Sequence, residues 1–220
     1  MGKYFGTDGF RGEANVDLTV EHAYKVGRYL GYYYGKKTSN DRARVVIGKD
    51  TRRSSYMFEY ALVSGLTASG ADVYLMHVTP TPSVSYMVRI DEFDCGIMIS
   101  ASHNPYYDNG IKIINGQGYK LEADVEKEIE DYIDGIIPEI PLAKRDKIGR
   151  TTDYSAGRNR YIGYLMTLAT RSYKNIRVGL DCANGASSTV AKSVFEALGA
   201  KVYVISSQPD GTNINDSCGS

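Results

Sequence analysis

The chain has 220 residues, and its 26 lysine and arginine side chains are balanced by 26 aspartate and glutamate side chains. This length suits one large domain or one and a fraction. Because no excess of basic residues is available to neutralise a phosphate backbone, nucleic acid is not an expected partner. The N-terminus lacks the apolar segment of a signal peptide, and no stretch approaches the roughly 20 apolar residues of a membrane span. We therefore expect a cytoplasmic protein with no membrane partner.

The first third of the chain alternates predicted helices and strands. Apolar residues recur at helical spacing over 19–35, and a short β-branched strand follows at 45–48. After the polar segment 49–55 the pattern predicts a second helix and then a strand over 71–78. The next helix is expected to begin near Pro82, because proline is favoured in the first turn of a helix.

The middle of the chain contains the clearest strand. Residues 95–100, CGIMIS, form a nearly continuous apolar run, which is typical of a strand buried on both faces. The run leads into a polar loop, after which a strand is predicted over 111–114 and a helix over 123–134. This alternation predicts an α/β protein, a three-layer α/β/α sandwich with a mixed, mostly parallel sheet.

The last third predicts the start of a second domain of similar fold. Residues 135–152 combine prolines, glycines and mixed charge without a period, which is typical of a connecting segment. We therefore predict one domain over 1–150 and a second one over 151–220. Its predicted elements are two helices and two strands, at 154–168, 175–181, 190–198 and 201–206. Because about 70 residues with so few strands give a thin core, we expect this second domain to be incomplete.

Three segments rich in glycine and polar residues lie next to predicted strands: FGTDGFRG (5–12), GKDTRRSS (48–55) and ISASHNPYYDNGIK (99–112). The first segment alone could be a plain turn. In the second segment, Asp50 and Arg52 could form a local ion pair, brace a loop or contact a substrate. The third is more specific, because Ser, His, Asn, Asp and Lys follow a buried strand within a dozen positions, where α/β proteins place their chemistry.

These segments, together with PDGTNIN near the C-terminal end, resemble the α-D-phosphohexomutase superfamily. The four motifs occur in the family's order along the chain, and their forms are most similar to those of the phosphoglucosamine mutase family. The sister phosphomannomutases and phosphoglucomutases share the plan and stay open as alternatives, as does a non-catalytic binding module of the same fold. A nucleotide-binding Rossmann module is disfavoured, since the sequence has neither a GxGxxG segment after the first strand nor a Walker loop.

The resemblance implies a phosphoenzyme in which Ser102, the serine immediately before the histidine, carries the transferable phosphoryl group. On sequence alone, Ser100 is the alternative nucleophile. Arg11 and Lys112 match family positions near this phosphate, which implies that the arginine orients the phosphate and the lysine moves the proton of the sugar hydroxyl. His103 either polarises the phosphate or holds the loop by hydrogen bonds.

Other residues of these segments are expected to bind or to brace. The resemblance places Thr7 and Asn104 among the residues that bind substrate or phosphate, together with the arginine. Asn104 and Asn109 are also expected to shape the loop by hydrogen bonds to the local backbone. Asp50 and Arg52 are expected to brace the loop or an interface.

The reaction implied is the exchange of phosphate between the 6- and 1-positions of glucosamine through a bound bisphosphate. The substrate is then a hexosamine phosphate, and glucosamine or glucose 1,6-bisphosphate is the expected activator. Mg²⁺ would bind Ser102 through its phosphate. The family's aspartate-rich DGDxDR metal loop has no counterpart here, so the other metal ligands are expected to be absent from the chain, and the chain alone is expected to be inactive. A homodimer is left open.

Overall fold

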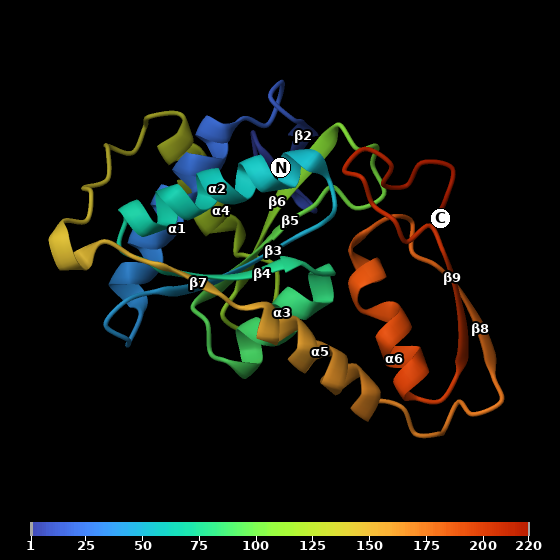
Figure 1. Cartoon of the computed structure of the whole chain (residues 1–220). Helices are drawn as coiled ribbons and strands as arrows, with labels where there is room; N and C mark the ends of the chain where they lie inside the picture. Colours follow the sequence, from blue (N-terminus) through green and yellow to red (C-terminus); the bar gives the residue numbers. More distant parts are fainter. Residues whose placement is uncertain (1, 220) are drawn as a thin grey trace.

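Helices and strands alternate along most of the chain (Figure 1). The computed structural model describes residues 2–219. The helices are α1 (Val20–Lys37), α2 (Arg53–Ala68), α3 (Thr81–Ile90), α4 (Ala123–Ile133), α5 (Ser155–Thr167) and α6 (Ala191–Ala197), with two short 3-10 helices, η1 (Arg145–Lys147) and η2 (Ala186–Thr189). The strands are β1 (Phe5–Gly6), β2 (Gly9–Glu13), β3 (Arg44–Lys49), β4 (Asp72–Val78), β5 (Cys95–Ile99), β6 (Asp108–Asn115), β7 (Thr151–Asp153), β8 (Arg177–Asp181) and β9 (Lys201–Ile205).

The larger sheet has seven strands in the order β1-β2-β6-β5-β3-β4-β7. Strand β3 pairs in parallel with β4 and β5, and β7 extends the parallel block beyond β4. Strands β1 and β6 run against their neighbours. Five of the seven strands therefore point the same way, which confirms the predicted mixed, mostly parallel sheet.

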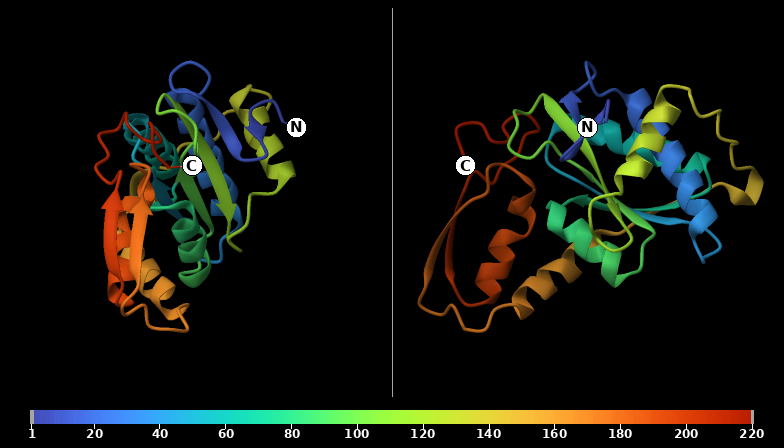
Figure 2. Two further views of the ribbon diagram at one scale, coloured as in Figure 1. Left: turned by 90° about the vertical axis from the view of Figure 1, so that its right-hand side faces the viewer. Right: turned by 180° about the vertical axis from the view of Figure 1, so that it is seen from behind.

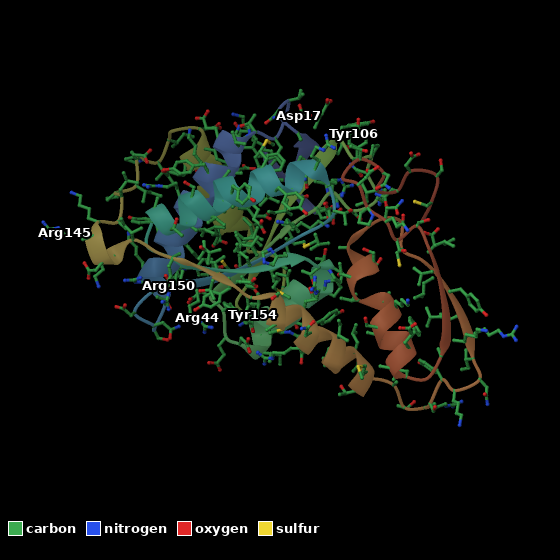
Figure 3. The ribbon with its side chains drawn as sticks, in the orientation of Figure 1. Asp17, Arg44, Tyr106, Arg145, Arg150 and Tyr154 are labelled. Atoms are coloured by element: carbon green, nitrogen blue, oxygen red, sulfur yellow. The ribbon has the colours of Figure 1, made fainter. Side chains whose placement is uncertain are left out.

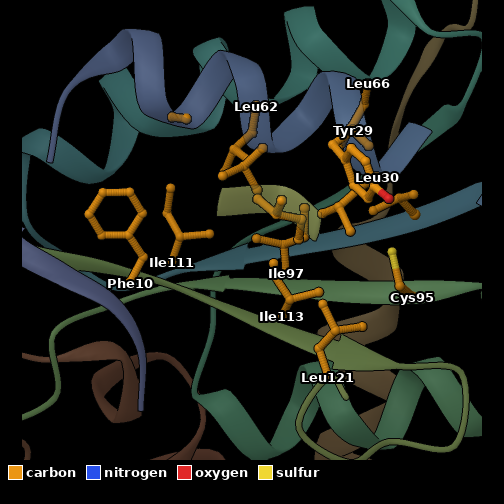
Figure 4. Packing of buried hydrophobic residues seen from close by; sticks show 14 of the residues in the cluster. Phe10, Tyr29, Leu30, Leu62, Leu66, Cys95, Ile97, Ile111, Ile113 and Leu121 are labelled. Carbon is orange, nitrogen blue, oxygen red and sulfur yellow. The ribbon is translucent and has the colours of Figure 1, made fainter. Parts of the chain in front are cut away.

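Helices cover both faces of this sheet, which confirms the three-layer α/β/α sandwich. Apolar side chains of α1, α2 and α4 form one core with the sheet, and Figure 4 shows members of it, among them Leu62, Ile97 and Ile111, packed between helices and strands. Val84, Met87 and Val88 of α3 form a second core on the opposite face. Helix α5 packs beside α3 and against β4.

Strand β5 is buried along its whole length, as its apolar run predicts. Cys95, Ile97 and Ile99 belong to the core under α1 and α2, whereas Met98 belongs to the core under α3. Because successive side chains of a strand point to opposite faces, a strand between two helical layers needs apolar residues at nearly every position.

Helices α1 and α2 approach each other closely because glycines stand at their contact. A Cβ atom on Gly65 of α2 would lie 2.2 Å from the carbonyl oxygen of Tyr24, and one on Gly27 of α1 would lie 2.5 Å from that of Leu62. No side chain fits into either space. The pair is thus held by backbone-to-backbone packing at a distance that only glycine permits.

The N-terminal segment forms a hairpin rather than the plain turn that the sequence allowed. Strands β1 and β2 pair with each other, Thr7 and Asp8 form the turn between them, and β2 continues the sheet by pairing with β6. The segment is short and rich in glycine, so its local pattern gives no strand signal. Pairing with β6, about a hundred residues later, makes it a strand.

The C-terminal part contains a separate parallel pair, β8 and β9, with α6 beside it (Figure 2). The helices and strands predicted here are confirmed within a few residues. Strand β7, at residues 151–153, pairs with β4 and so belongs to the first sheet. The domain boundary near residue 150 stays a prediction. Within residues 2–219, none of the helices combines the length and the apolar character that crossing a membrane requires.

Candidate active site

Two polar segments begin where neighbouring parallel strands end. Strand β5 ends at Ile99 and leads into residues 100–107, which we call the Ser102 loop, and β3 ends at Lys49 and leads into residues 50–52. Because β3 and β5 are paired in parallel, the two segments leave the same edge of the sheet. This is the edge at which α/β proteins place their ligands.

Ser102 is exposed and lies at a turn of the loop with a φ of 57°. Its backbone N–H donates to the Oγ atom of Ser100 over 3.1 Å. Ser100 itself is only 7% exposed. A group that accepts a phosphoryl group must be reached by its donor, so this difference in exposure favours Ser102 over Ser100 as the nucleophile.

Arg52 braces the Ser102 loop from the protein interior. Its side chain is fully buried, and its Nη1 atom forms an ion pair with Asp50. Its Nη2 atom donates to the carbonyl oxygens of Ser102 over 3.2 Å and Asn104 over 2.6 Å. The buried carboxylate of Asp50 also accepts hydrogen bonds from Arg52 N over 3.0 Å and Ser55 Oγ over 2.8 Å. The loop-bracing role predicted for Asp50 and Arg52 is confirmed.

Hydrogen bonds from the side chains of Asn104 and Asn109 to the local backbone are confirmed for Asn109, whose Oδ1 accepts from Gly110 N over 2.8 Å. The side chain of Asn104 bonds another side chain instead. Asn104 donates from its backbone N to Ala101 O over 3.1 Å and from Nδ2 to Asp108 Oδ2 over 2.9 Å. Asn109 is buried, and its Nδ2 donates to the hydroxyl of Ser54 over 2.8 Å. The structure thus assigns Asn104 a local role, while its contact with substrate or phosphate stays a prediction.

Arg11 has an unused donor inside the fold. The residue lies on β2 opposite Gly110, and a Cβ atom on this glycine would come within 2.9 Å of the Cγ atom of Arg11. Its Nη2 atom is 3.2 Å from Asp8 Oδ2. Its Nε atom is buried and has no hydrogen-bond partner among residues 2–219. A buried N–H without an acceptor is costly, so an anion at this position would be bound favourably.

Lys112 lies on β6 opposite Met98 and is half-buried. Burial lowers the pKa of its amine, and the neighbouring Arg11 lowers it further. The side chain lines a cavity of about 300 Å³ together with Thr7 and Ser85. A lysine with a lowered pKa is more readily neutral, and a neutral amine can accept a proton from a hydroxyl group.

The side chains of Thr7, His103 and Ser102 make no hydrogen bond to another candidate residue among the described residues. Thr7 is exposed in the turn of the N-terminal hairpin and lines the same cavity as Lys112. His103 is exposed, and its ring makes no hydrogen bond within the described part of the chain. Ser102 likewise has no side-chain hydrogen bond to Arg11 or Lys112 within residues 2–219. The roles of these residues stay predictions.

The residues present do not form a metal site by themselves. Among residues 2–219, no group of three or more His, Cys, Asp or Glu side chains is placed to hold a metal ion. Octahedral Mg²⁺ needs several oxygen ligands, and a phosphate on Ser102 would supply only part of that set.

Sequence reasoning missed a contact from the C-terminal segment. Asn215 donates from Nδ2 to the carbonyl oxygens of Ser102 over 3.1 Å and Asn104 over 3.0 Å. Figure 3 shows Tyr106, which belongs to the same loop, beside the ribbon of the C-terminal segment. The motif PDGTNIN was the available signal, but nothing in the sequence says which surface this segment covers.

Two solved structures share this fold. The chain is similar to a phosphoglucomutase/phosphomannomutase family protein from Burkholderia thailandensis, with a TM-score of 0.78, 23% identity, and coverage of 95% of this chain and 45% of that one. A putative phosphomannomutase from Thermus thermophilus gives a TM-score of 0.75 at 26% identity, over 94% of this chain and 46% of that one. The fold of the chain is therefore the phosphohexomutase fold.

The chain belongs to the phosphoglucomutase/phosphomannomutase family, because residues 2–138 match the family's alpha/beta/alpha domain I. The chain is also similar to curated relatives that carry a more specific name. It is 75% identical to a phosphoglucosamine mutase from Lachnoclostridium phytofermentans and 70% identical to one from Lachnospira eligens, in both cases over the whole of this chain. The chain spans 48% and 49% of the length of these two relatives.

Proposed function

We propose that this chain is part of a phosphoglucosamine mutase, which interconverts glucosamine 6-phosphate and glucosamine 1-phosphate. The identity of 75% to a phosphoglucosamine mutase, over the whole chain, carries this proposal. The exposed serine in a braced loop at the strand ends supports the phosphoserine chemistry. The proposed role lies in the cytoplasmic synthesis of amino-sugar and peptidoglycan precursors.

In the proposed mechanism Ser102 carries the phosphoryl group. The bond between its Oγ atom and phosphorus breaks while a bond from the sugar hydroxyl oxygen to phosphorus forms, and the hydroxyl proton moves to Nζ of Lys112. The lowered pKa of this lysine suits it to receive the proton. The bisphosphate then turns over in the site. The bond between its other phosphorus and the sugar oxygen breaks while a bond from Ser102 Oγ to that phosphorus forms, and the proton on Nζ of Lys112 moves to the freed sugar oxygen.

Phosphate binding is assigned to the arginine beside this lysine. The buried Nε–H of Arg11 lacks an acceptor, and an oxygen of the phosphoryl group would satisfy it. Thr7 and Asn104 are proposed to add polar contacts, and His103 to polarise the phosphate or steady the loop. Mg²⁺ on the phosphate and a 1,6-bisphosphate activator belong to the proposal, as does a homodimer, and the further metal ligands would come from beyond this chain.

A phosphomannomutase or phosphoglucomutase is the second candidate. The likeness to the putative phosphomannomutase from Thermus thermophilus favours it, although at 26% identity it is far weaker than the likeness to the phosphoglucosamine mutases. Both candidates use the same chemistry on a phosphoserine and differ in the sugar.

A comparison of substrates tests the proposal. In a protein that contains this chain and has the length of its relatives, kcat/KM for glucosamine 6-phosphate should exceed that for mannose 6-phosphate and glucose 6-phosphate by at least about tenfold, since a built polar contact to one substrate group discriminates strongly. A preference for mannose or glucose would establish the second candidate. The 220-residue chain alone should show no turnover, and metal-dependent turnover by it would contradict that prediction.

A further inference from the structure

Two carbonyl groups of the Ser102 loop each accept two hydrogen bonds. The carbonyl oxygen of Ser102 accepts from Arg52 Nη2 over 3.2 Å and from Asn215 Nδ2 over 3.1 Å. The carbonyl oxygen of Asn104 accepts from the same two nitrogens, over 2.6 Å and 3.0 Å. The loop is therefore held from the buried side by Arg52 and from the opposite part of the chain by Asn215.

The hydrogen-bond donors and acceptors of these four groups match in number. Each carbonyl oxygen has two lone pairs, and each of the two NH₂ groups has two hydrogens. The four hydrogen bonds thus use every lone pair of both carbonyls and every hydrogen of both nitrogens. An asparagine amide is suited to this position because it supplies two donors on one short side chain, whereas a carboxylate of the same shape supplies none.

The backbone of Asn215 is set up for this contact. The residue has a φ of 61°, a left-handed conformation that asparagine tolerates better than most residues. Its backbone N donates to Ala183 O over 2.9 Å, and the preceding Ile214 is buried. The amide is consequently presented from a fixed backbone and does not have to be ordered at the moment of contact.

The segment around Asn215 also docks on the first part of the chain without its help. Arg53 N, at the start of α2, donates to Gly211 O over 2.9 Å, and Thr51 Oγ1 donates to Asn184 O over 2.6 Å. These bonds attach the C-terminal part beside residues 50–52. Loss of the Asn215 amide alone should therefore leave the docking intact.

We propose that Asn215 is a positioning residue, which fixes the backbone of the Ser102 loop from the C-terminal part of the chain. The loop then has its working shape only while that part is docked, so the reactivity of Ser102 depends on how the two parts of the chain are placed. We call the two hydrogen bonds from Asn215 to the Ser102 loop the clamp. The effect of the clamp on the reactivity of Ser102 rests on the proposed function. Its effect on the order of the loop does not.

Amide hydrogen exchange in the 220-residue chain tests the clamp. Asn215→Asp keeps the shape and the left-handed backbone but removes both donors, and Asn215→Gly keeps the backbone and removes the side chain. In both variants the backbone amides over residues 101–105 should exchange about tenfold faster, because the loop opens more easily once these hydrogen bonds are lost. The matched control is Asn213→Asp. It removes the hydrogen bond of 3.0 Å that Asn213 Nδ2 donates to Gln208 O within its own loop, and it should leave the exchange over residues 101–105 unchanged.

The outcomes show whether the side-chain hydrogen bonds of Asn215 or only its backbone conformation order the loop, and they do not depend on the proposed function. Faster exchange over 101–105 in both Asn215 variants, with the protection of β8 and β9 retained, supports the clamp. Unchanged exchange over 101–105 in Asn215→Asp and Asn215→Gly overturns it, because the loop then keeps its order without the side-chain amide of Asn215. Since the measurement needs no sugar phosphate, a wrong substrate assignment would not change either result.

Discussion

The buried guanidinium of Arg52 contacts Asp50 and two carbonyl groups of the Ser102 loop. Replacing Arg52 with alanine leaves the carboxylate of Asp50 buried without its ion-pair partner and removes one of the two hydrogen bonds that each of two loop carbonyls accepts. Removing one partner of a buried pair costs about 3 to 5 kcal/mol, so we expect Arg52→Ala to lower the free energy of unfolding by about that amount. Urea unfolding followed by circular dichroism measures it.

The control is the next residue in the chain. Arg53 is exposed, and Arg53→Ala should change the free energy of unfolding by no more than about 0.5 kcal/mol. Similar losses in both variants would mean that Arg52 acts through its general charge rather than through its buried contacts.

Lys112 makes the stability depend on pH in a defined direction. Burial and Arg11 lower the pKa of its amine below the usual 10.5, so the folded protein disfavours the protonated form that predominates near neutral pH. The stability contribution is present above the ordinary lysine pKa and is lost as pH falls through the lowered pKa. Lys112→Met should therefore raise the melting temperature at pH 7, and the gain should shrink toward pH 10.5.

Melting temperatures measured from pH 6 to pH 10.5 test this sign. The exposed Lys192 provides the matched control, because Lys192→Met should shift the melting temperature little at any pH. A gain for Lys112→Met that grows with pH would show that the amine is stabilised in its charged form.

At the scale of residues, sequence reasoning could name the polar segments but not their partners. Ser102 is exposed and Ser100 is buried because of where the loop leaves β5, and the local sequence does not reveal this difference. The partnership of Asn215 with the Ser102 loop joins residues more than a hundred positions apart. Such contacts are set by the docking of whole elements rather than by local pattern.

At the scale of elements, the contact between α1 and α2 depends on glycine. Gly65→Ala adds a methyl group where the Cβ would lie 2.2 Å from Tyr24 O, so the helices must move apart. Alanine favours a helix by up to about 1 kcal/mol, but overpacking at a tight contact costs typically 1 to 3 kcal/mol. We expect a net loss of free energy of unfolding of up to about 2 kcal/mol.

Gly163 in α5 supplies the control, since nothing lies within 4 Å of the position of its Cβ. Gly163→Ala should be neutral or stabilise by up to about 1 kcal/mol, through helix propensity alone. Denaturant unfolding of both variants compares the two effects. If the two substitutions shift stability in the same direction, close packing at Gly65 is not what sets the distance between α1 and α2.

The elements themselves were predictable where burial gives a strong pattern. The run 95–100 predicts β5, and helical spacing predicts α1, α4 and α5. The hairpin of β1 and β2 was missed, because FGTDGFRG has too few apolar residues for a strand signal and is ordered by pairing with β6. Pattern thus identifies elements that bury a face of their own, and it misses elements that the rest of the sheet completes.

At the scale of the whole molecule, Gly211 joins the two parts of the chain. Its carbonyl accepts from Arg53 N at the start of α2, where no side chain caps the helix, and its φ is +95°. A Cβ atom would lie 3.2 Å from the Cβ of Arg53. Gly211→Ala should lower the free energy of unfolding by about 1 to 3 kcal/mol, through backbone strain and a weakened helix cap.

Gly135→Ala is the control that separates the effect of backbone strain from the effect of the contact at Gly211. Its φ is +75°, but nothing lies within 4 Å of the position of its Cβ, so Gly135→Ala carries the backbone strain alone. Thermal unfolding should show the larger loss for Gly211→Ala, together with faster hydrogen exchange at the start of α2. Equal losses and unchanged exchange would mean that the contact at Gly211 adds nothing to the docking.

Phosphosite mapping by mass spectrometry tests whether Ser102 carries the phosphoryl group. The sample is a protein that contains this chain at the length of its relatives, before and after incubation with glucose 1,6-bisphosphate and Mg²⁺. Phosphate should be found on Ser102 in the unaltered protein and in Ser100→Ala, and should be absent in Ser102→Ala. Phosphate on Ser100, or transferable phosphate that persists in Ser102→Ala, would mean that Ser102 is not the phosphoryl carrier.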